Sequence, residues 1–207
     1  NSLGAVYETL DGELCQKKAL SCYQQAYEMQ QKLDEEEASL ESKRRLSNCM
    51  RNMAGAYSIK KTRKDKEKAV FLYQEVCRIR EKLADIKASA GARKSLAIAY
   101  ISLGNLYIEN KSQKELDLAV ELYEKAYTIR KTLAEELKTS GRRRQLSAIC
   151  YSLGKAYRLY QEEEYYEKAL VYLGMDLKLS EQINKELKTA ASENSLAQSH
   201  MAMGMIM

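Results

Sequence analysis

Residues 103–126, LGNLYIENKSQKELDLAVELYEKA, decide the fold of this 207-residue chain. Leu103 and Tyr107 stand four residues apart in the first half, and Ala119 and Tyr123 stand four apart in the second. Spacings of three and four place side chains on one face of an α-helix. A polar stretch separates the two halves. The segment therefore predicts two helices joined by a polar turn.

The same pattern recurs every fifty residues. The first-helix motif appears at Leu3, Gly4 and Tyr7, then Met53, Ala54 and Tyr57, then Leu103, Gly104 and Tyr107, then Leu153, Gly154 and Tyr157, and last at Met203 and Gly204. The second-helix motif appears at Ala19, Ala69, Ala119 and Ala169 and, four residues later, at Tyr23, Tyr73, Tyr123 and Leu173. A fixed period predicts stacked repeats of two helices each, at 1–39, 40–89, 90–139, 140–189 and, in part, 190–207.

Small and hydroxyl residues mark further features of each copy. Gly inside a helix lowers its stability, so small residues that recur there need a structural reason. Small residues recur in the first helices at Gly4, Ala54, Gly104, Gly154 and Gly204. They predict close helix crossings, in which the facing second helix contributes Ala19, Ala69, Ala119 and Ala169. Ser112 with Glu115 has the spacing of a helix N-cap and predicts the start of a second helix. Hydroxyl residues recur where one copy meets the next, at Ser39, Ser89, Thr139 and Thr189. Gly91 and Gly141 follow two of them and are expected to end helices.

Composition excludes several classes of protein. The chain has no Pro, a net charge of +5 and five Cys, with no C-x-x-C pair and one His. We therefore expect an all-α protein, no metal site and reduced, mostly buried thiols, as in a cytoplasmic protein. No run of 18 apolar residues predicts a membrane span. Neither G-x-x-x-x-G-K nor G-x-G-x-x-G occurs, and no set of acid, base and nucleophile is visible, so we expect neither a cofactor nor an enzyme.

The repeated residues resemble the tetratricopeptide repeat over essentially the whole chain. The third copy carries that family's pattern at Leu103, Gly104, Tyr107, Ala119, Tyr123 and Ala126. The resemblance implies a right-handed α–α superhelix of about four helix-turn-helix repeats and a partial fifth. The fifty-residue period departs from the family's usual 34. Gln31, Glu81, Lys131 and Glu181 replace the family's Pro, so we expect the second helices to run on. Long repeats of this kind look like arrays in large bacterial multidomain proteins.

Members of this family bind peptides on the concave surface of their first helices. The resemblance places eight candidate residues in this groove: Arg51, Asn52, Ile101, Asn105, Ile108, Tyr151, Lys155 and Arg158. Cations and amides suit a carboxylate or an acidic peptide, and the isoleucines suit an apolar part. The leading hypothesis is thus a protein-interaction scaffold. The alternative reading of the same residues is a solvated surface.

Two other hypotheses use different residues. Basic residues recur near first-helix starts, at Lys43, Arg44 and Arg45, at Arg93 and Lys94, and at 142–144. Local pairing with acids such as those of 35–37 and 135–136 explains this row as well as phosphate contacts do, so a nucleic-acid partner is not expected.

The competing function is a structural spacer or self-assembly segment of a larger bacterial signalling protein. Apolar residues line the last helix, at Met201, Met203, Met205, Ile206 and Met207, and no polar capping repeat closes either end. We expect the natural protein to continue in both directions, or a neighbouring chain to associate end to end through this helix.

Overall fold

The structure is a computed structural model that describes residues 13–60, 62–110, 112–160 and 162–205. Within these ranges the chain is all-helical, with eight α-helices and one short 3-10 helix. The helices are α2 (Glu13–Glu37), α3 (Leu40–Ser58), α4 (Arg63–Ile86), α5 (Ala90–Asn110), α6 (Gln113–Leu137), α7 (Ser140–Tyr157), η1 (Arg158–Tyr160), α8 (Glu163–Leu187) and α9 (Ala190–Gly204). The copy of the motif at Leu3, Gly4 and Tyr7 and the end of the apolar run at 206–207 lie outside the described residues.

The helices keep the fifty-residue period. First helices begin at Leu40, Ala90, Ser140 and Ala190. The second helices α2, α4, α6 and α8 have 24 or 25 residues, against 18 to 21 for α3, α5 and α7. Each second helix continues past the position where the tetratricopeptide pattern has Pro, as expected. Residue contacts divide the chain into two compact units, Asn1–Leu106 and Tyr107–Met207, which are described separately below.

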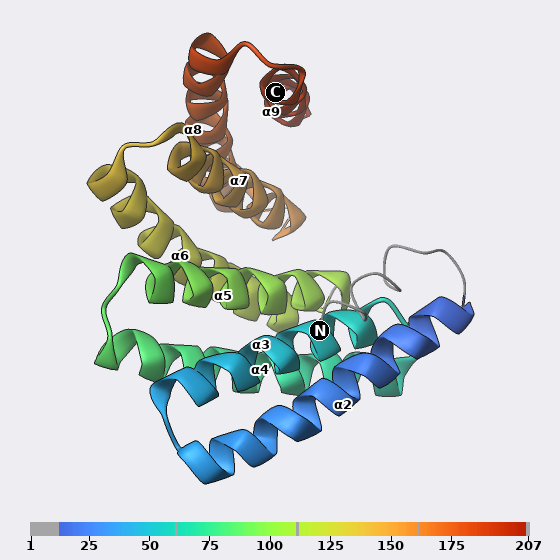
Figure 1. The fold of residues 1–207 in the computed structure, drawn as a ribbon. Helices are drawn as coiled ribbons and strands as arrows, with labels where there is room; N and C mark the ends of the chain where they lie inside the picture. Colours follow the sequence, from blue (N-terminus) through green and yellow to red (C-terminus); the bar gives the residue numbers. More distant parts are fainter. Residues whose placement is uncertain (1–12, 61, 111, 161, 206–207) are drawn as a thin grey trace. The chain divides into compact units, whose positions relative to one another are not determined.

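In unit 1, α3 packs against both α2 and α4 (Figure 1). The repeated motif residues form the apolar core between them. This core includes Ala19, Tyr23, Met53, Ala54, Ala69, Tyr73 and Val76. The 3.6-residue pattern of the sequence is therefore the pattern of burial.

In unit 2, α7 packs against α6 and α8, and α8 also packs against α9 (Figure 1). Gly154 lies where α7 crosses α8. A Cβ atom added there would come within 2.5 Å of Leu173 Cγ and 3.2 Å of the Ala169 carbonyl oxygen. The close crossing expected between the Gly154 and Ala169 positions is thus confirmed in this copy.

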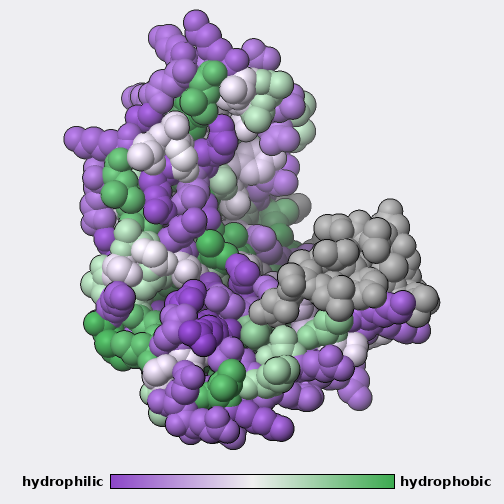
Figure 2. All heavy atoms as spheres, in the orientation of Figure 1, coloured by the Kyte–Doolittle hydropathy of each residue, from purple (hydrophilic) through white to green (hydrophobic). Residues whose placement is uncertain are grey.

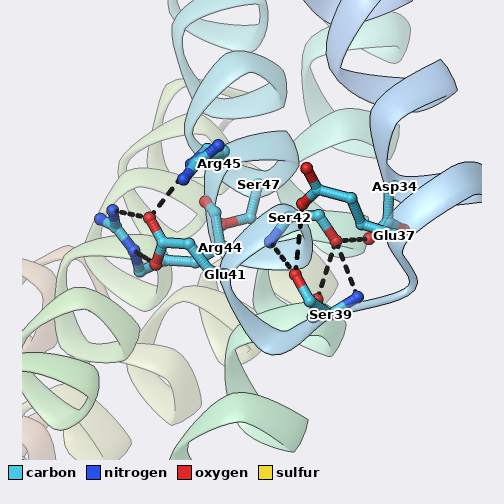
Figure 3. Close-up of polar contacts among 8 residues, drawn as sticks. All are labelled: Asp34, Glu37, Ser39, Glu41, Ser42, Arg44, Arg45 and Ser47. Carbon is cyan, nitrogen blue, oxygen red and sulfur yellow. Dashed lines mark hydrogen bonds and ion pairs between the residues drawn. The ribbon is translucent and has the colours of Figure 1, made fainter.

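Hydroxyl side chains cap several helices, and the cap predicted at Ser112 is confirmed. Ser39 caps α3: its Oγ accepts from the Ser42 amide at 3.0 Å, and Ser42 Oγ accepts from the Ser39 amide at 3.1 Å (Figure 3). Thr139 and Thr189 cap α7 and α9, and Ser112 caps α6 by accepting from Glu115. Each such cap satisfies an amide that the helix leaves without a partner.

The expectation that Gly91 and Gly141 end helices is wrong. Both are the second residue of a first helix, α5 and α7. The actual ends use residues with a left-handed backbone instead: Ala38, Lys138 and Lys188 have φ of 46°, 45° and 47°. Ala88, at the same position of the second copy, has no positive φ, because α4 ends earlier, at Ile86.

These left-handed ends lead to a stability prediction. Lys138→Gly and Lys188→Gly are each expected to raise the free energy of unfolding by about 1 kcal/mol, because Gly adopts positive φ without the cost that other residues meet. Ala88→Gly is the matched control and is expected to lower stability by a few tenths of a kcal/mol. Urea unfolding followed by circular dichroism measures all three variants. Equal effects at positions 88, 138 and 188 would contradict the assigned backbone geometry.

Within the described ranges, no helix combines the length and apolar character needed to cross a bilayer. Four of the five cysteines have described side chains. Cys49, Cys77 and Cys150 are buried, Cys22 is half-buried, and all four are free thiols.

Candidate functional site

The eight residues predicted to bind a peptide all lie on first helices or on η1. Arg51 and Asn52 lie on α3, Ile101, Asn105 and Ile108 on α5, Tyr151 and Lys155 on α7, and Arg158 on η1. Asn105 and Lys155 are exposed, and the other six are half-buried. The first four of the eight belong to unit 1 and the last four to unit 2. Each unit thus presents a set of polar and apolar side chains on its first helices.

In unit 1, the structure brings Arg51 and Asn52 together. Arg51 Nη2 donates to Asn52 Oδ1 at 3.1 Å. Among the described residues, Arg51 makes no ion pair with an acid. Its guanidinium therefore keeps donors and a net charge for an incoming anion.

A second arginine lies behind this surface. Arg80 of α4 is 4% exposed. Its Nη2 donates to Asn48 Oδ1 at 2.7 Å, its Nη1 donates to the Ser95 carbonyl oxygen at 2.6 Å, and its Nε lies 3.4 Å from Ser47 Oγ. All three acceptors are uncharged. Burial and the neighbouring Arg51 lower the pKa of Arg80 to about 10, so the side chain stays protonated at neutral pH.

Arg80 was not among the residues predicted from the sequence, although the repeat contains a signal for it. Arg130 stands fifty residues later, and its Nη1 donates to the Gln145 carbonyl oxygen at 2.5 Å, as Arg80 does to Ser95. Both arginines join a second helix to the first helix that follows it. The recurrence of an arginine at positions 80 and 130, beside the apolar face of the second helix, could have indicated that this side chain joins two helices.

In unit 2, Lys155 lies over the ring of Tyr151. The ammonium is 5.3 Å from the ring centroid, a distance at which a cation is attracted to the aromatic face. Arg158 begins η1 and is half-buried, as is Ile108 on α5. In the part of the chain that is described, neither Lys155 nor Arg158 pairs with an acid.

The basic row near the helix starts differs from these residues because three of its arginines, Arg44, Arg45 and Arg143, pair with glutamates. Glu41 accepts from Arg44 Nη2 at 2.6 Å and from Arg45 Nε at 3.1 Å (Figure 3). These hydrogen bonds, with that of Arg44 the stronger, lower the pKa of Glu41 to about 2. In unit 2, Arg143 pairs with Glu186. In these two examples the paired acids are Glu41 and Glu186, which lie outside the acidic segments 35–37 and 135–136.

Unit 2 also buries a carboxyl group. Asp176 of α8 is 2% exposed, and its Oδ1 accepts from Ser147 Oγ of α7 at 2.5 Å. Ser147 Oγ lies 3.1 Å from Ser180 Oγ, which in turn accepts from Ser199 of α9 at 3.0 Å. Asp176 Oδ2 is buried without a hydrogen-bond partner. Burial raises the pKa of Asp176, and hydrogen bonds from the serines only partly oppose this effect.

Asp176→Asn is therefore expected to stabilise the chain at neutral pH. A carboxyl group whose pKa rises on folding binds its proton more tightly in the folded state, so folding stability falls as pH rises through the folded pKa. Asn cannot ionise, and its Oδ1 can still accept from Ser147. We expect a melting temperature a few degrees above that of the original protein at pH 8, with the difference shrinking as pH falls toward 4. A difference that does not change with pH would contradict the assignment.

The described residues contain no group of three or more His, Cys, Asp or Glu arranged to hold a metal ion. Cys150 is buried, and burial together with the nearby Asp176 raises the pKa of its thiol to about 12. This thiol is protonated at neutral pH and is a poor nucleophile. His200 is exposed on α9.

Comparison with known proteins gives no family. No protein-family model matches the chain, and no curated protein matches it. Two solved structures with a similar arrangement are a de novo designed helical repeat protein and a chain from the computational design of self-assembling cyclic homooligomers. The first is 13% identical with a TM-score of 0.39, over 92% of this chain and 94% of that one. The second is 13% identical with a TM-score of 0.44, over 99% of this chain and 91% of that one. Likenesses of this size carry no argument about family or function.

Proposed function

We propose that this chain is a protein-interaction scaffold that binds an acidic peptide, or the carboxylate of one, on the surface of its first helices. The proposal includes a right-handed superhelix of the tetratricopeptide kind, with Asn105 and the isoleucines at 101 and 108 beside the cations. No catalytic step is part of this function.

The observation that carries the proposal is the uncompensated charge around Arg51. Its only described polar partner is Asn52, an amide. The cation behind it, Arg80, also has only uncharged acceptors. A site with two guanidinium groups and no acid attracts carboxylates, and Arg51 has the exposure to bind one with two hydrogen bonds. Lys155 and Arg158 supply cations of the same kind in unit 2.

The contrast with the other cations supports this choice of surface. Arg44, Arg45, Arg63 and Arg78 each lie within 3.1 Å of a glutamate three or four residues away. Such pairs stabilise a helix slightly and leave little net charge for a partner. On the face drawn in Figure 2, hydrophilic residues predominate and hydrophobic ones form separate patches. The unpaired cations therefore distinguish the proposed surface better than apolar area does.

Selection from a randomised peptide library tests the proposal. We expect the bound peptides to be enriched in Asp, Glu or a free carboxyl terminus. A variant with Arg51, Asn105, Lys155 and Arg158 all changed to Ala is expected to bind the selected peptides at least about tenfold more weakly, since one charged hydrogen bond alone has this value. The control variant changes Arg45, Arg63 and Arg78 to Ala and removes the same number of cations. Selected peptides without acidic enrichment, or an equal loss of peptide affinity in both variants, would contradict the proposal.

A further inference from the structure

Exposed apolar side chains recur at two positions of the second and fourth copies. The two positions hold Ile59 and Phe71 in the second copy and Leu159 and Val171 in the fourth, with 53%, 62%, 50% and 55% of their surface exposed. In the third copy the same two positions hold Glu109 and Glu121. The fold of a repeat therefore does not require apolar residues at these positions. Their presence in the second and fourth copies needs another explanation.

Charges of opposite sign lie between these apolar residues. The first turn of α4 carries Arg63, Lys64 and one acid, Asp65, and the equivalent turn of α8 carries Glu163 and Glu164. Arg63 is paired with Glu67 at 2.9 Å and Glu164 with Lys168 at 2.8 Å, so Lys64 and Glu163 are the charges of these turns that the edges offer to a partner. The Arg63 side chain is 93% exposed. Cations at a helix start are disfavoured by the helix dipole, whereas acids are favoured. Lys64 is therefore unfavourable at the start of α4, whereas Glu163 is favourable at the start of α8.

Each of these regions also has a pocket at equivalent residues. The pocket in unit 1 has a volume of about 430 Å³ and is lined in part by Tyr57, Lys68 and Phe71. The pocket in unit 2 has a volume of about 480 Å³, and its lining includes Tyr157 and Val171. Lys68 lies 5.1 Å from the centre of the Tyr57 ring, so the tyrosine at the pocket floor already contacts a cation.

The pocket in unit 2 has a more aromatic and more acidic lining. The rings of Tyr157 and Tyr172 are stacked, with centroids 5.7 Å apart, and Tyr157 donates to Glu124 Oε1 at 2.5 Å. Glu124, Glu164 and Glu167 face a single cation, Lys168, in this lining. The lining in unit 1 has the opposite balance, with Lys64 and Lys68 against Glu67.

We propose that two copies of this chain associate by docking the basic edge of unit 1 on the acidic edge of unit 2. The basic edge is Ile59, Arg63, Lys64, Lys68 and Phe71. The acidic edge is Leu159, Glu163, Glu164, Glu167 and Val171. Docking places Phe71 of one copy against the tyrosine-lined pocket of the other, and Lys64 beside Glu163. Burial of the apolar residues supplies affinity, and charge complementarity selects the register.

This association is independent of peptide binding, since it uses second helices and the turns before them. It also differs from association through α9. Each copy carries one basic and one acidic edge. The contact joins two unlike surfaces, so either edge of one copy can bind the complementary edge of another.

Charge exchange at equivalent positions tests the proposal on the 207-residue chain. One variant carries Arg63→Glu and Lys64→Glu, so that both edges are acidic. A second carries Glu163→Lys and Glu164→Lys, so that both edges are basic. A third carries all four changes and restores opposite signs. Sedimentation equilibrium at several protein and salt concentrations measures self-association, and circular dichroism checks folding. The first variant places acids at a helix start, where they are favoured, but it also removes the Arg63–Glu67 pair, so its circular dichroism spectrum must match that of the original chain.

We expect the original chain to self-associate more weakly as salt rises. Each two-residue variant is expected to associate at least about tenfold more weakly, because like charges then face each other. The four-residue variant, and an equimolar mixture of the two two-residue variants, are expected to associate again. A chain that is monomeric at every concentration at low salt would overturn the proposal. Self-association that both two-residue variants keep would overturn it as well and would point to another surface, such as the exposed Met201 and Met205 of α9.

Discussion

Arg80→Ala is expected to lower the free energy of unfolding by about 2–4 kcal/mol. The substitution removes a buried guanidinium that donates to the Ser95 carbonyl oxygen and to Asn48 Oδ1. Both acceptors then lose a partner, and the side chain's volume becomes a cavity between three helices. Urea unfolding followed by circular dichroism measures the change.

Two further variants show whether the bridge itself matters. Arg78→Ala removes an exposed arginine of the same helix that pairs with Glu75, and is expected to cost less than about 0.5 kcal/mol. Arg80→Lys keeps the positive charge but loses the planar guanidinium with its several N–H donors. The loss of unfolding free energy in this variant is therefore expected to lie between those of Arg80→Ala and Arg78→Ala. Equal stability of Arg80→Ala and Arg78→Ala would show that Arg80 does not join α4 to α3 and α5.

Gly154→Ala is expected to destabilise the chain by about 1–3 kcal/mol, although Ala normally favours a helix. The added methyl group would come within 2.5 Å of Leu173 Cγ, and the backbone oxygen of Ala169 blocks a shift toward α8. The two helices must separate or Leu173 must leave its rotamer. Thermal unfolding measures the loss.

Gly55→Ala is the matched control at a helix interior. Its nearest new contact is Tyr73 Oη at 3.6 Å, an ordinary van der Waals distance. This variant is expected to be more stable than the original by up to about 1 kcal/mol. If Gly154→Ala also stabilised the chain, the close crossing of α7 and α8 would be contradicted.

The helices could be predicted from the sequence because their determinants are local. The period of fifty residues indicated the two helices of each copy, and the spacing of Ser112 and Glu115 predicted the cap of α6. Ser39, Thr139 and Thr189 recur at the boundaries between copies, and the structure shows that they too are caps. The helix ends could not be predicted in the same way. Lys138 and Lys188 adopt a left-handed backbone that neither residue favours, so their identities carried no signal, and nearby glycines at 91 and 141 were misleading.

The candidate surface was predictable only in part. The repeat register placed Arg51 on an incompletely buried helix face, but it could not show which cations are paired. Pairing depends on side chains of other turns and other helices, as in the Arg143–Glu186 pair. Asp176 shows the same difficulty. Its position holds buried Val76 and Ala126 in earlier copies, which was an unused sign of burial, while the serines that surround it come from three helices.

The most direct test of peptide binding is an NMR titration of the isotope-labelled chain with an acidic peptide selected from the library. The proposal predicts that the largest backbone amide shifts occur on first helices, around Arg51 and Asn52 and from Tyr151 to Arg158. The same titration of the Arg51, Asn105, Lys155 and Arg158 alanine variant is expected to show little change. Shifts confined to the second helices, or equal in the original and the variant, would contradict the claim that the first helices bind the partner.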